Sequence, residues 1–244
     1  MRSSADQRHR SHRDIWSSKP VLREVYGDLY RRVASNCVSG MTVEVGGGSG
    51  NFKEFRPDVV SLDVVPAPWL DLVADAQFLP FRDGSIRNLV MLDVLHHIEF
   101  PLRFFREAAR VLSPGGRVVA IEPGLSPISR PFYSLLHEEP VDLSVDPLGE
   151  GVPSAGKDPY EGNQAVPTLL ATRERLRLAE LVPDLSLVRT EWMSLFAYPL
   201  SGGFKRWSLL SSAAARVILH IEDRLPNAVR RICGFRLLLA WQRA

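Results

Sequence analysis

The feature that most constrains this chain is a glycine-rich turn that directly follows a short β-branched run. Residues 43–45 read Val-Glu-Val, and glycines then occupy the alternating positions 46, 48 and 50. Glycine permits positive φ, and because it has no Cβ it lets a ligand lie directly against the main chain. The pattern therefore predicts a buried strand that leads into a ligand-binding turn. A dinucleotide fingerprint would need another glycine at position 51, which is Asn51, so a nicotinamide cofactor is disfavoured.

A second acid follows at the spacing that a nucleotide-binding βαβ unit requires. Residues 59–64 predict the next parallel strand, and Asp63 lies 19 residues after Glu44. In such units an acid about 20 residues on, at the end of the second strand, binds the ribose diol. A carboxylate suits this task because it accepts charge-assisted hydrogen bonds from both hydroxyls.

Predicted strands and helices then alternate as far as Pro123, and this alternation indicates a parallel sheet with helices on both faces. Before the glycine turn, apolar residues recur at helical spacing over residues 20–37, and Pro20 is well placed to start a helix there. Residues 1–19 are expected to form a basic flexible arm. Residues 20–244 are expected to form one domain.

Three later segments follow the motif order of a known family. They are Asp71–Ser85, with its Asp-Ala and Leu-Pro-Phe elements, Asn88–Ile98, and Leu112–Pro123 with its Pro-Gly-Gly turn. Together with the glycine turn they resemble the class I S-adenosylmethionine (SAM) methyltransferases, of the UbiE-like or type 11 kind. The resemblance covers about residues 41–123. Members usually carry Phe-Asp where this chain has Ile86-Arg87, and there we expect a change of packing without loss of cofactor binding.

The resemblance implies a Rossmann-like, doubly wound α/β fold with a mostly parallel seven-stranded sheet. The seventh strand would be antiparallel and lie between strands five and six. Residues 124–166 follow strand five, at the edge where open α/β sheets bind ligands, and are interpreted either as an acceptor lid or as a surface insertion. Residues 202–225 are expected to form a helical extension. Its apolar stripe would pack in the core or in a homodimer, with a membrane interface as the other alternative.

The resemblance also implies that SAM is the cofactor and which residues contact it. Glu44 would help to hold the amino group of the methionine portion, and the glycines would approach that portion. Asp63 would bind the ribose, and Asp75 would accept a hydrogen bond from the adenine amino group. The full set expected at the cofactor is Glu44, Gly46, Gly48, Gly50, Asp63, Val64, Asp75, Ala76 and Asp93.

Methyl transfer from a sulfonium requires no metal, so no metal site is expected, and positioning alone can supply ~7–11 kcal/mol. His96 and His97 are the candidate catalytic bases, with His97 preferred, because in this fold the loop after strand four borders the donor methyl. For both histidines, a structural role in shaping that loop is the alternative, and it is favoured over a catalytic one. Polar residues that could reach the acceptor are Glu122, Tyr133, His137 and Glu138.

Charge is distributed unevenly although the whole chain carries only +2. Residues 1–35 hold eight Lys and Arg against four Asp and Glu, and residues 201–244 hold eight against two, so residues 36–200 carry −8. The acidic middle disfavours a nucleic-acid partner, and no stripe of basic and aromatic residues crosses the core. The basic ends suit an anionic partner or a membrane surface, although solvated helix faces are the simpler interpretation.

The two cysteines, Cys37 and Cys233, provide no disulfide framework, and no apolar run is long enough for a transmembrane segment. We therefore expect a cytoplasmic protein, and a peripheral contact at the inner membrane face stays open. The function expected is SAM-dependent methylation of a small-molecule or lipid-linked acceptor, with a weak preference for an amphiphilic one. The alternative is a non-catalytic partner or scaffold protein with the same fold.

Overall fold

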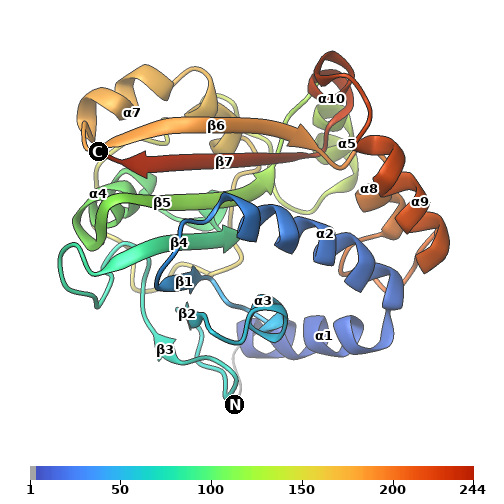
Figure 1. The fold of residues 1–244 in the computed structure, drawn as a ribbon, viewed down its shortest axis with the longest axis horizontal. Helices are drawn as coiled ribbons and strands as arrows, with labels where there is room; N and C mark the ends of the chain where they lie inside the picture. The colour runs from blue at the N-terminus through green and yellow to red at the C-terminus, as the bar shows by residue number, and fades with distance from the viewer. Residues whose placement is uncertain (1–3) are drawn as a thin grey trace.

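The computed structural model describes residues 4–244 and is built on one twisted sheet with helices on both faces (Figure 1). The sheet order is β3-β2-β1-β4-β5-β7-β6. Every pairing is parallel except those of β7, which runs antiparallel to both β5 and β6. This confirms the expected fold class. The strands are β1 Thr42–Val45, β2 Val60–Asp63, β3 Leu72–Val73, β4 Ile86–Leu92, β5 Leu112–Pro123, β6 Leu185–Met193 and β7 Arg236–Arg243.

The sheet separates the buried apolar residues into two cores, and helices cover each of them. Residues of α4, α6 and α7 belong to one core, and residues of α1, α2, α3, α8 and α9 belong to the other. The helices are α1 Ser4–Ser18, α2 Pro20–Asn36, α3 Asn51–Phe55, α4 Pro101–Val111, α5 Ser129–Leu136, α6 Val166–Ala171, α7 Arg175–Leu181, α8 Ala197–Ser201, α9 Ser212–Glu222 and α10 Asn227–Cys233, with a 3-10 turn η1 at Leu95–His97.

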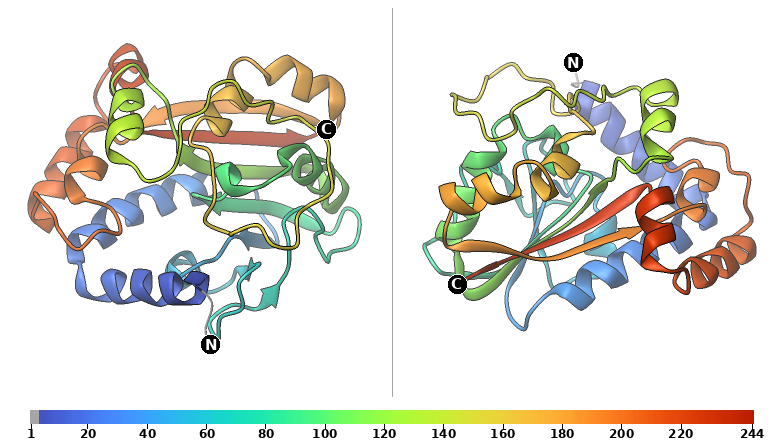
Figure 2. Two further views of the ribbon diagram at one scale, coloured as in Figure 1. Left: turned by 180° about the vertical axis from the view of Figure 1, so that it is seen from behind. Right: turned by 90° about the horizontal axis from the view of Figure 1, so that it is seen from above.

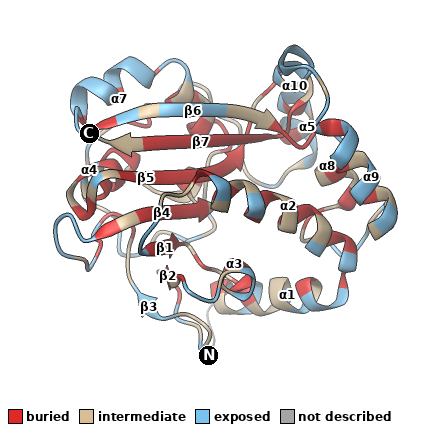
Figure 3. Cartoon of the chain, viewed as in Figure 1, coloured by how far each residue is buried: buried red, intermediate tan, exposed pale blue. Residues whose placement is uncertain are grey.

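The central strands are apolar on both sides because both faces of the sheet are covered. One row of register partners crosses β1, β4, β5 and β7 and consists of Val43, Leu89, Val118 and Trp241. All four side chains belong to the core beneath α4. The next row of register partners, Val90, Val119 and Ala240, belongs to the opposite core, as the two-residue period of a strand requires. Figure 3 shows β4, β5 and β7 largely buried and the edge strand β6 partly exposed.

The N-terminal segment differs from the expected flexible arm, since residues 4–18 form helix α1. Residues 1–3 of that arm lie outside the described residues. Trp16 is buried, and its indole N–H donates to Glu54 Oε2 at 3.1 Å. The sequence of α1 is too polar to predict a helix from periodicity, and short helices are marginal without tertiary contacts. Its order therefore depends on contacts to the rest of the protein.

Helix α1 is joined to α2 through Lys19, whose side chain is buried. The Lys19 ammonium donates to the carbonyl oxygens of Gly203, Lys205 and Trp207, at 2.7, 2.8 and 2.8 Å. An ammonium group has three donors, so all of them are satisfied by this one loop. The junction is thereby fixed to the segment that precedes α9.

The segment after β5 begins with α5 and continues as an irregular path to α6 (Figure 2). It lies against the turn η1, where Asn163 N–H donates to the His96 carbonyl and Lys157 Nζ to the His97 carbonyl, each at 2.9 Å. Leucines at 169, 170, 176 and 181 indicate a single amphipathic helix over residues 167–181, but this segment forms two short helices, α6 and α7. Thr172 interrupts them with a non-helical φ and ψ. No helix within residues 4–244 is long and apolar enough to cross a bilayer.

Candidate functional site

The glycine turn connects β1 to α3 at the carboxyl edge of the sheet. Gly46, Gly48 and Gly50 have φ of +73°, +47° and +78°. A Cβ at Gly46 would stand 2.3 Å from Val94 Cγ2, and one at Gly50 would stand 2.7 Å from Trp69 Cδ1. At Gly48 the nearest atom would be 3.8 Å away. Gly46 and Gly50 are therefore required by close packing, whereas Gly48 is required by its φ and has space above it.

Asp63 lies at the tip of β2 against the glycine turn. Its Oδ2 accepts from the Gly48 N–H and its Oδ1 from the Val65 N–H, each at 2.9 Å. The side chain is largely buried and cannot rotate away without losing both bonds. A carboxylate has further lone pairs on each oxygen. These lone pairs can accept hydrogen bonds from a diol, and the role of Asp63 in ribose binding stays a prediction.

Glu44 lies behind the same turn and is buried. Ser61 Oγ–H donates to Glu44 Oε2 at 2.6 Å. Burial raises the pKa of Glu44 to about 7, because the ionised form is poorly solvated, and the nearby Asp63 carboxylate adds to this. A cation bound beside Glu44 would compensate its charge. This is compatible with the expected contact to an ammonium group.

Helix α1 lies over the glycine turn and forms its roof. The Arg13 guanidinium donates to the Ser49 carbonyl at 2.8 Å and lies 4.6 Å from the centre of the Trp69 ring. Trp69 Nε1 in turn donates to the Gly48 carbonyl at 2.8 Å. Arg13 was missed in the sequence because residues 1–19 carry no apolar period that would place it in a helix.

His9 of α1 approaches the expected ribose site, with its Nε2 4.0 Å from Asp63 Oδ2. Burial lowers the pKa of His9 and therefore favours the neutral ring. Its Nδ1 is buried and has no hydrogen-bond partner among the described residues. An unpaired buried polar atom is rare in proteins, and a water or a polar ligand can satisfy it. The Asp63 carboxylate and the polar His9 ring beside it fit a ligand with hydrogen-bonding groups.

Of the residues expected to contact the adenine, Asp75 already accepts a hydrogen bond from within the protein. Asp75 Oδ1 accepts from the Gln77 backbone N–H at 2.9 Å, and Ala76 is buried. Val64 is 46% exposed and lines an open pocket of about 400 Å³. The other lining residues come from the start of α1 and from two loops: Ser4, Ala5, Val65, Pro66, Gly156, Asp158 and Pro159.

Asp93, which follows β4, has a φ of +58° and directs its carboxylate to Arg236. Tyr26 Oη–H donates to Asp93 Oδ2 at 3.4 Å, and the Arg236 guanidinium lies 4.0 Å from the centre of the Tyr198 ring. Arg236 is the first residue of β7 and is buried. Asp93 was expected to contact the cofactor, and that role stays a prediction. Arg236 carried no signal in the sequence.

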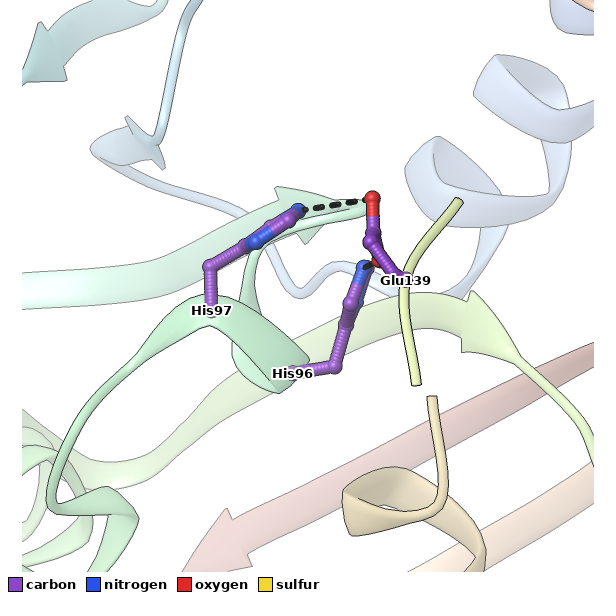
Figure 4. Close-up of side chains that lie close together, drawn as sticks. All are labelled: His96, His97 and Glu139. Carbon is purple, nitrogen blue, oxygen red and sulfur yellow. Dashed lines mark ion pairs between the residues drawn. The ribbon is translucent and has the colours of Figure 1, made fainter. Parts of the chain in front are cut away.

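His96 is buried, and both of its ring nitrogens face carboxylates (Figure 4). Nδ1 lies 2.6 Å from Glu122 Oε2, and Nε2 lies 3.1 Å from Glu139 Oε2. Burial alone would lower the pKa of His96, but the hydrogen bonds to the two carboxylates raise it to about 9. His96 therefore has no ring nitrogen free to accept a proton from an acceptor.

His97 lies beside His96, with its Nε2 3.9 Å from Glu139 Oε1 (Figure 4). Burial and the neighbouring His96 lower the pKa of His97 to about 3, so its ring is neutral near pH 7. Burial opposes the ionised form of Glu139, but the hydrogen bond to His96 and the charge of His96 lower the pKa of Glu139 to about 2. Glu139 was missed in the sequence, where His137 and Glu138 of the same segment were considered.

The other residues considered for contact with the acceptor are either bonded within the protein or exposed to solvent. Tyr133 is buried and its hydroxyl donates to the Phe235 carbonyl at 2.8 Å. The Glu138 side chain is 80% exposed. His137 Nδ1 accepts from the Glu139 backbone N–H at 3.2 Å, so it supports the position of Glu139. Glu122 lies fully buried at the end of β5 and holds His96.

Residues 43–120 match the family model described as a methyltransferase domain. A demethylmenaquinone methyltransferase of Chlamydia trachomatis is 34% identical over 83 residues, which are 34% of this chain and 36% of that protein. A 27-O-demethylrifamycin SV methyltransferase of Amycolatopsis mediterranei is 35% identical over 111 residues, 46% of this chain and 35% of that protein. The chain therefore spans little more than a third of the length of these relatives.

Likeness to solved structures extends over nearly the whole chain. A Thermotoga maritima SAM-dependent methyltransferase, described as a possible histamine N-methyltransferase, has a TM-score of 0.58 at 16% identity and covers 92% of this chain and 91% of its own. Geranyl diphosphate C-methyltransferase of Streptomyces coelicolor has a TM-score of 0.51 at 15% identity, covering 90% and 79%. At these identities the likeness shows that the fold is shared.

Proposed function

From the premise that residues 43–120 are a methyltransferase domain, we propose that this chain transfers a methyl group from SAM to a small-molecule or lipid-linked acceptor. The observation that carries the proposal is the clamp between Asp63 and the Gly48 amide, which fixes an acidic group over a glycine turn with open space. Relatives named for a menaquinone precursor and for rifamycin support an acceptor of this class.

The residues around the turn fit the parts of SAM. We propose that Asp63 binds the ribose diol, that Glu44 faces the cationic amino group, and that the open face of Gly48 receives the methionine portion. When bound, this cofactor supplies a methyl group that its sulfonium already activates. The protein contributes position and exclusion of water, and helix α1 over the turn serves the second purpose.

The acceptor side is proposed to lie at η1 and the segment that contains Glu139. There, Glu122 and Glu139 fix His96 from opposite sides, so His96 acts as a positioning residue. The neutral His97 and the ionised Glu139 can each accept a hydrogen bond from a hydroxyl or amine of the acceptor. His97 remains the preferred proton acceptor of the two histidines. Because its lowered pKa makes it a weak base, positioning is proposed to supply most of the rate.

Calorimetric titration of the purified chain with SAM, S-adenosylhomocysteine and NAD tests the proposal. We expect both sulfur ligands to bind and NAD to give no heat of binding. Binding of NAD alone would overturn the proposed cofactor. If none of the three binds, the scaffold alternative replaces the enzyme.

We further propose that the acceptor is amphiphilic and that the protein meets it at a membrane surface. Leu135 and Leu136 of α5 are 80% and 63% exposed, and Ile232 of α10 is 50% exposed. The two helices lie side by side, since the Ile128 N–H donates to the Ile232 carbonyl at 3.1 Å (Figure 2). We call this surface the α5–α10 patch; its residues are Ile128, Leu135, Leu136, Val229 and Ile232, with Arg130 and Arg231 exposed on the same helices.

Co-sedimentation with vesicles tests this second part. We expect binding to vesicles that contain phosphatidylglycerol, weaker binding to pure phosphatidylcholine, and loss of binding in Leu135→Asp/Leu136→Asp. Leu176→Asp, on the exposed face of α7, is the matched control. If the protein does not bind anionic vesicles, the proposal is overturned. If it forms a concentration-dependent dimer in the absence of vesicles, the patch is instead an interface with a second copy of the chain.

A further inference from the structure

Three side chains with metal-ligating atoms converge between η1 and the segment after α5 (Figure 4). His96 Nε2 lies 3.1 Å from Glu139 Oε2, and His97 Nε2 lies 3.9 Å from Glu139 Oε1. One ligand atom from each of the three residues can be chosen so that all lie within 4.8 Å of one another. The histidines are adjacent in the chain, whereas Glu139 arrives from 42 residues further on.

We propose that His96, His97 and Glu139 bind a first-row divalent metal ion, with Zn²⁺ as the reference case. With metal–ligand bonds of about 2.0–2.2 Å in a tetrahedral site, neighbouring ligand atoms stand roughly 3.3–3.6 Å apart. The two distances from Glu139 lie on either side of that range. Two imidazoles with one carboxylate suit zinc or iron, whereas magnesium and calcium prefer oxygen ligands alone.

Glu122 supplies the second element of such a site. It is fully buried and accepts from the backbone N–H groups of Val94 and Leu95, each at 2.9 Å, so its carboxylate is held in place. His96 Nδ1 lies 2.6 Å from its other oxygen. A histidine that donates through Nδ1 to a carboxylate presents Nε2 to a metal, and this arrangement is typical of metal-binding histidines.

The ring of His97 is fixed by packing. Gly162 lies against its far edge, where a Cβ would stand 2.6 Å from His97 Nδ1. The ring can therefore present only Nε2 to Glu139. With a metal ion bound there, His97 would be a ligand and would not also serve as the proton acceptor. In the metal-free protein a proton on His96 Nε2 bridges to Glu139, and the bound ion would take its place.

Three protein ligands leave one coordination position open. The side chains of His97 and Glu139 keep 15% and 18% of their surface exposed, so this position is reachable from solvent. If the proposed function holds, that position would receive an oxygen of the acceptor and orient it toward the cofactor. The acceptor class then narrows to molecules with a hydroxyl, phenol or enol oxygen at the methylated end. The metal site itself does not depend on the methyltransferase function.

The test is titration of the chelator-stripped chain with Zn²⁺ by calorimetry, with Co²⁺ absorption as a direct report on ligand geometry. We expect one equivalent of Zn²⁺ and visible Co²⁺ bands. Glu139→Gln and His97→Ala should each weaken Zn²⁺ binding at least about tenfold, and Glu122→Gln about 10–100-fold. His220→Ala, which removes an exposed histidine on α9, should leave the affinity unchanged.

Thermal unfolding of each variant confirms that it folds. Equal Zn²⁺ affinity in Glu139→Gln, His97→Ala and the parent chain would overturn the site, and so would the absence of any Zn²⁺ or Co²⁺ binding. SAM is titrated separately into the stripped chain. SAM binding without Zn²⁺ binding overturns this inference alone, whereas Zn²⁺ binding without SAM binding overturns the proposed function alone.

Discussion

Asp93 and Arg236 form a two-pronged ion pair that joins the end of β4 to the start of β7. Arg236 Nη2 donates to Asp93 Oδ2 at 2.8 Å, and Nη1 pairs with Oδ1. The guanidinium is buried, whereas the Asp93 side chain keeps 30% of its surface exposed. The pair holds the positive-φ residue after β4 in place, and η1 with its two histidines begins two residues later.

Removing the carboxylate from this pair should destabilise the fold more than removing the cation. Asp93→Asn leaves a buried guanidinium without its counter-charge and should lower the free energy of unfolding by about 3–5 kcal/mol. Arg236→Met leaves a partly solvated carboxylate and should cost less. Urea unfolding measures both, and Arg216→Met, at an exposed pair with Glu24, is the control, with a loss of at most about 1 kcal/mol. A larger loss in Arg236→Met than in Asp93→Asn would contradict this account.

Glu44 should make the protein less stable as pH rises through its titration. Its pKa in the folded protein is raised to about 7 from an ordinary value of 4.5, so the folded state binds the proton more tightly than the unfolded state does. Its contribution is therefore most favourable below pH 4.5 and is lost between pH 4.5 and 7. Glu44→Gln should remove this loss and gain up to about 3 kcal/mol relative to the parent at pH 8. A difference between the two proteins that does not vary from pH 4.5 to 8 would show that the pKa is not raised.

If Glu44 faces the amino group of SAM, binding near pH 6.5 should release a proton. The bound cation favours the ionised carboxylate and lowers its pKa, so protonated Glu44 loses its proton on binding. Calorimetry in two buffers of different ionisation enthalpy counts the protons released. Glu44→Gln should show no such release, and an unchanged count in that variant would place the proton elsewhere.

Alanine substitutions at the glycines of the turn should differ in their effects on stability and on SAM binding. Gly48 and Gly115 both have positive φ and space for a methyl group, so Gly48→Ala and Gly115→Ala should each lose about 1–2 kcal/mol of stability. Only Gly48→Ala should also weaken SAM binding, at least about tenfold, because the new methyl group would occupy the ligand's space. Gly46→Ala should unfold more readily than either, since its Cβ would collide with Val94. Unfolding and SAM titration of the three variants provide the comparison, and equal SAM affinity in Gly48→Ala and Gly115→Ala would exclude contact at Gly48.

Arg13 should slow the departure of SAM. Arg13 holds α1 to the turn through the Ser49 carbonyl and the Trp69 ring. Arg13→Ala therefore removes contacts between α1 and the turn and leaves the hydrogen bonds of Asp63 unchanged. We expect a dissociation rate at least about tenfold faster by stopped-flow fluorescence. Arg10→Ala, which removes a pair with Asp6 within the same helix, should leave the rate near that of the parent. Equal rates in both variants would mean that α1 does not cover the bound cofactor.

The sequence predicted the parts of this structure whose signals are local. Gly48 and Asp63 meet because a strand, a short helix and a parallel strand of fixed length separate them, and the parallel sheet brings both strand ends to one edge. The interruption of the helix at Thr172 was missed because single short segments have weak periodicity. The order of β5, β7 and β6 came from the family resemblance and not from any local pattern.

The remaining contacts could not be predicted because they join residues far apart in the chain. Asp93 and Arg236 are 143 residues apart, and nothing in the run Arg236–Arg243 indicates that its first residue is a buried cation. Glu139 lies in an irregular segment, where no period tells which of two adjacent glutamates points inward. His9 and Arg13 belong to a helix that is ordered by the turn it covers.

The three hydrogen bonds of Lys19 give helix α1 a fixed pivot. A 15-residue helix is about 22 Å long, so a rotation of about 10° at that pivot moves its free end by about 4 Å. The displacement is smallest beside the pivot, at Trp16, and largest at the free end, at Ser4. His9, which lies beside Asp63, is near the middle of the helix and moves by an intermediate amount. If the cofactor binds beneath α1 as proposed, a small rotation of the intact helix, with release of the Arg13 contact to the turn, would suffice for its exchange, and the strands of the sheet would keep their pairing.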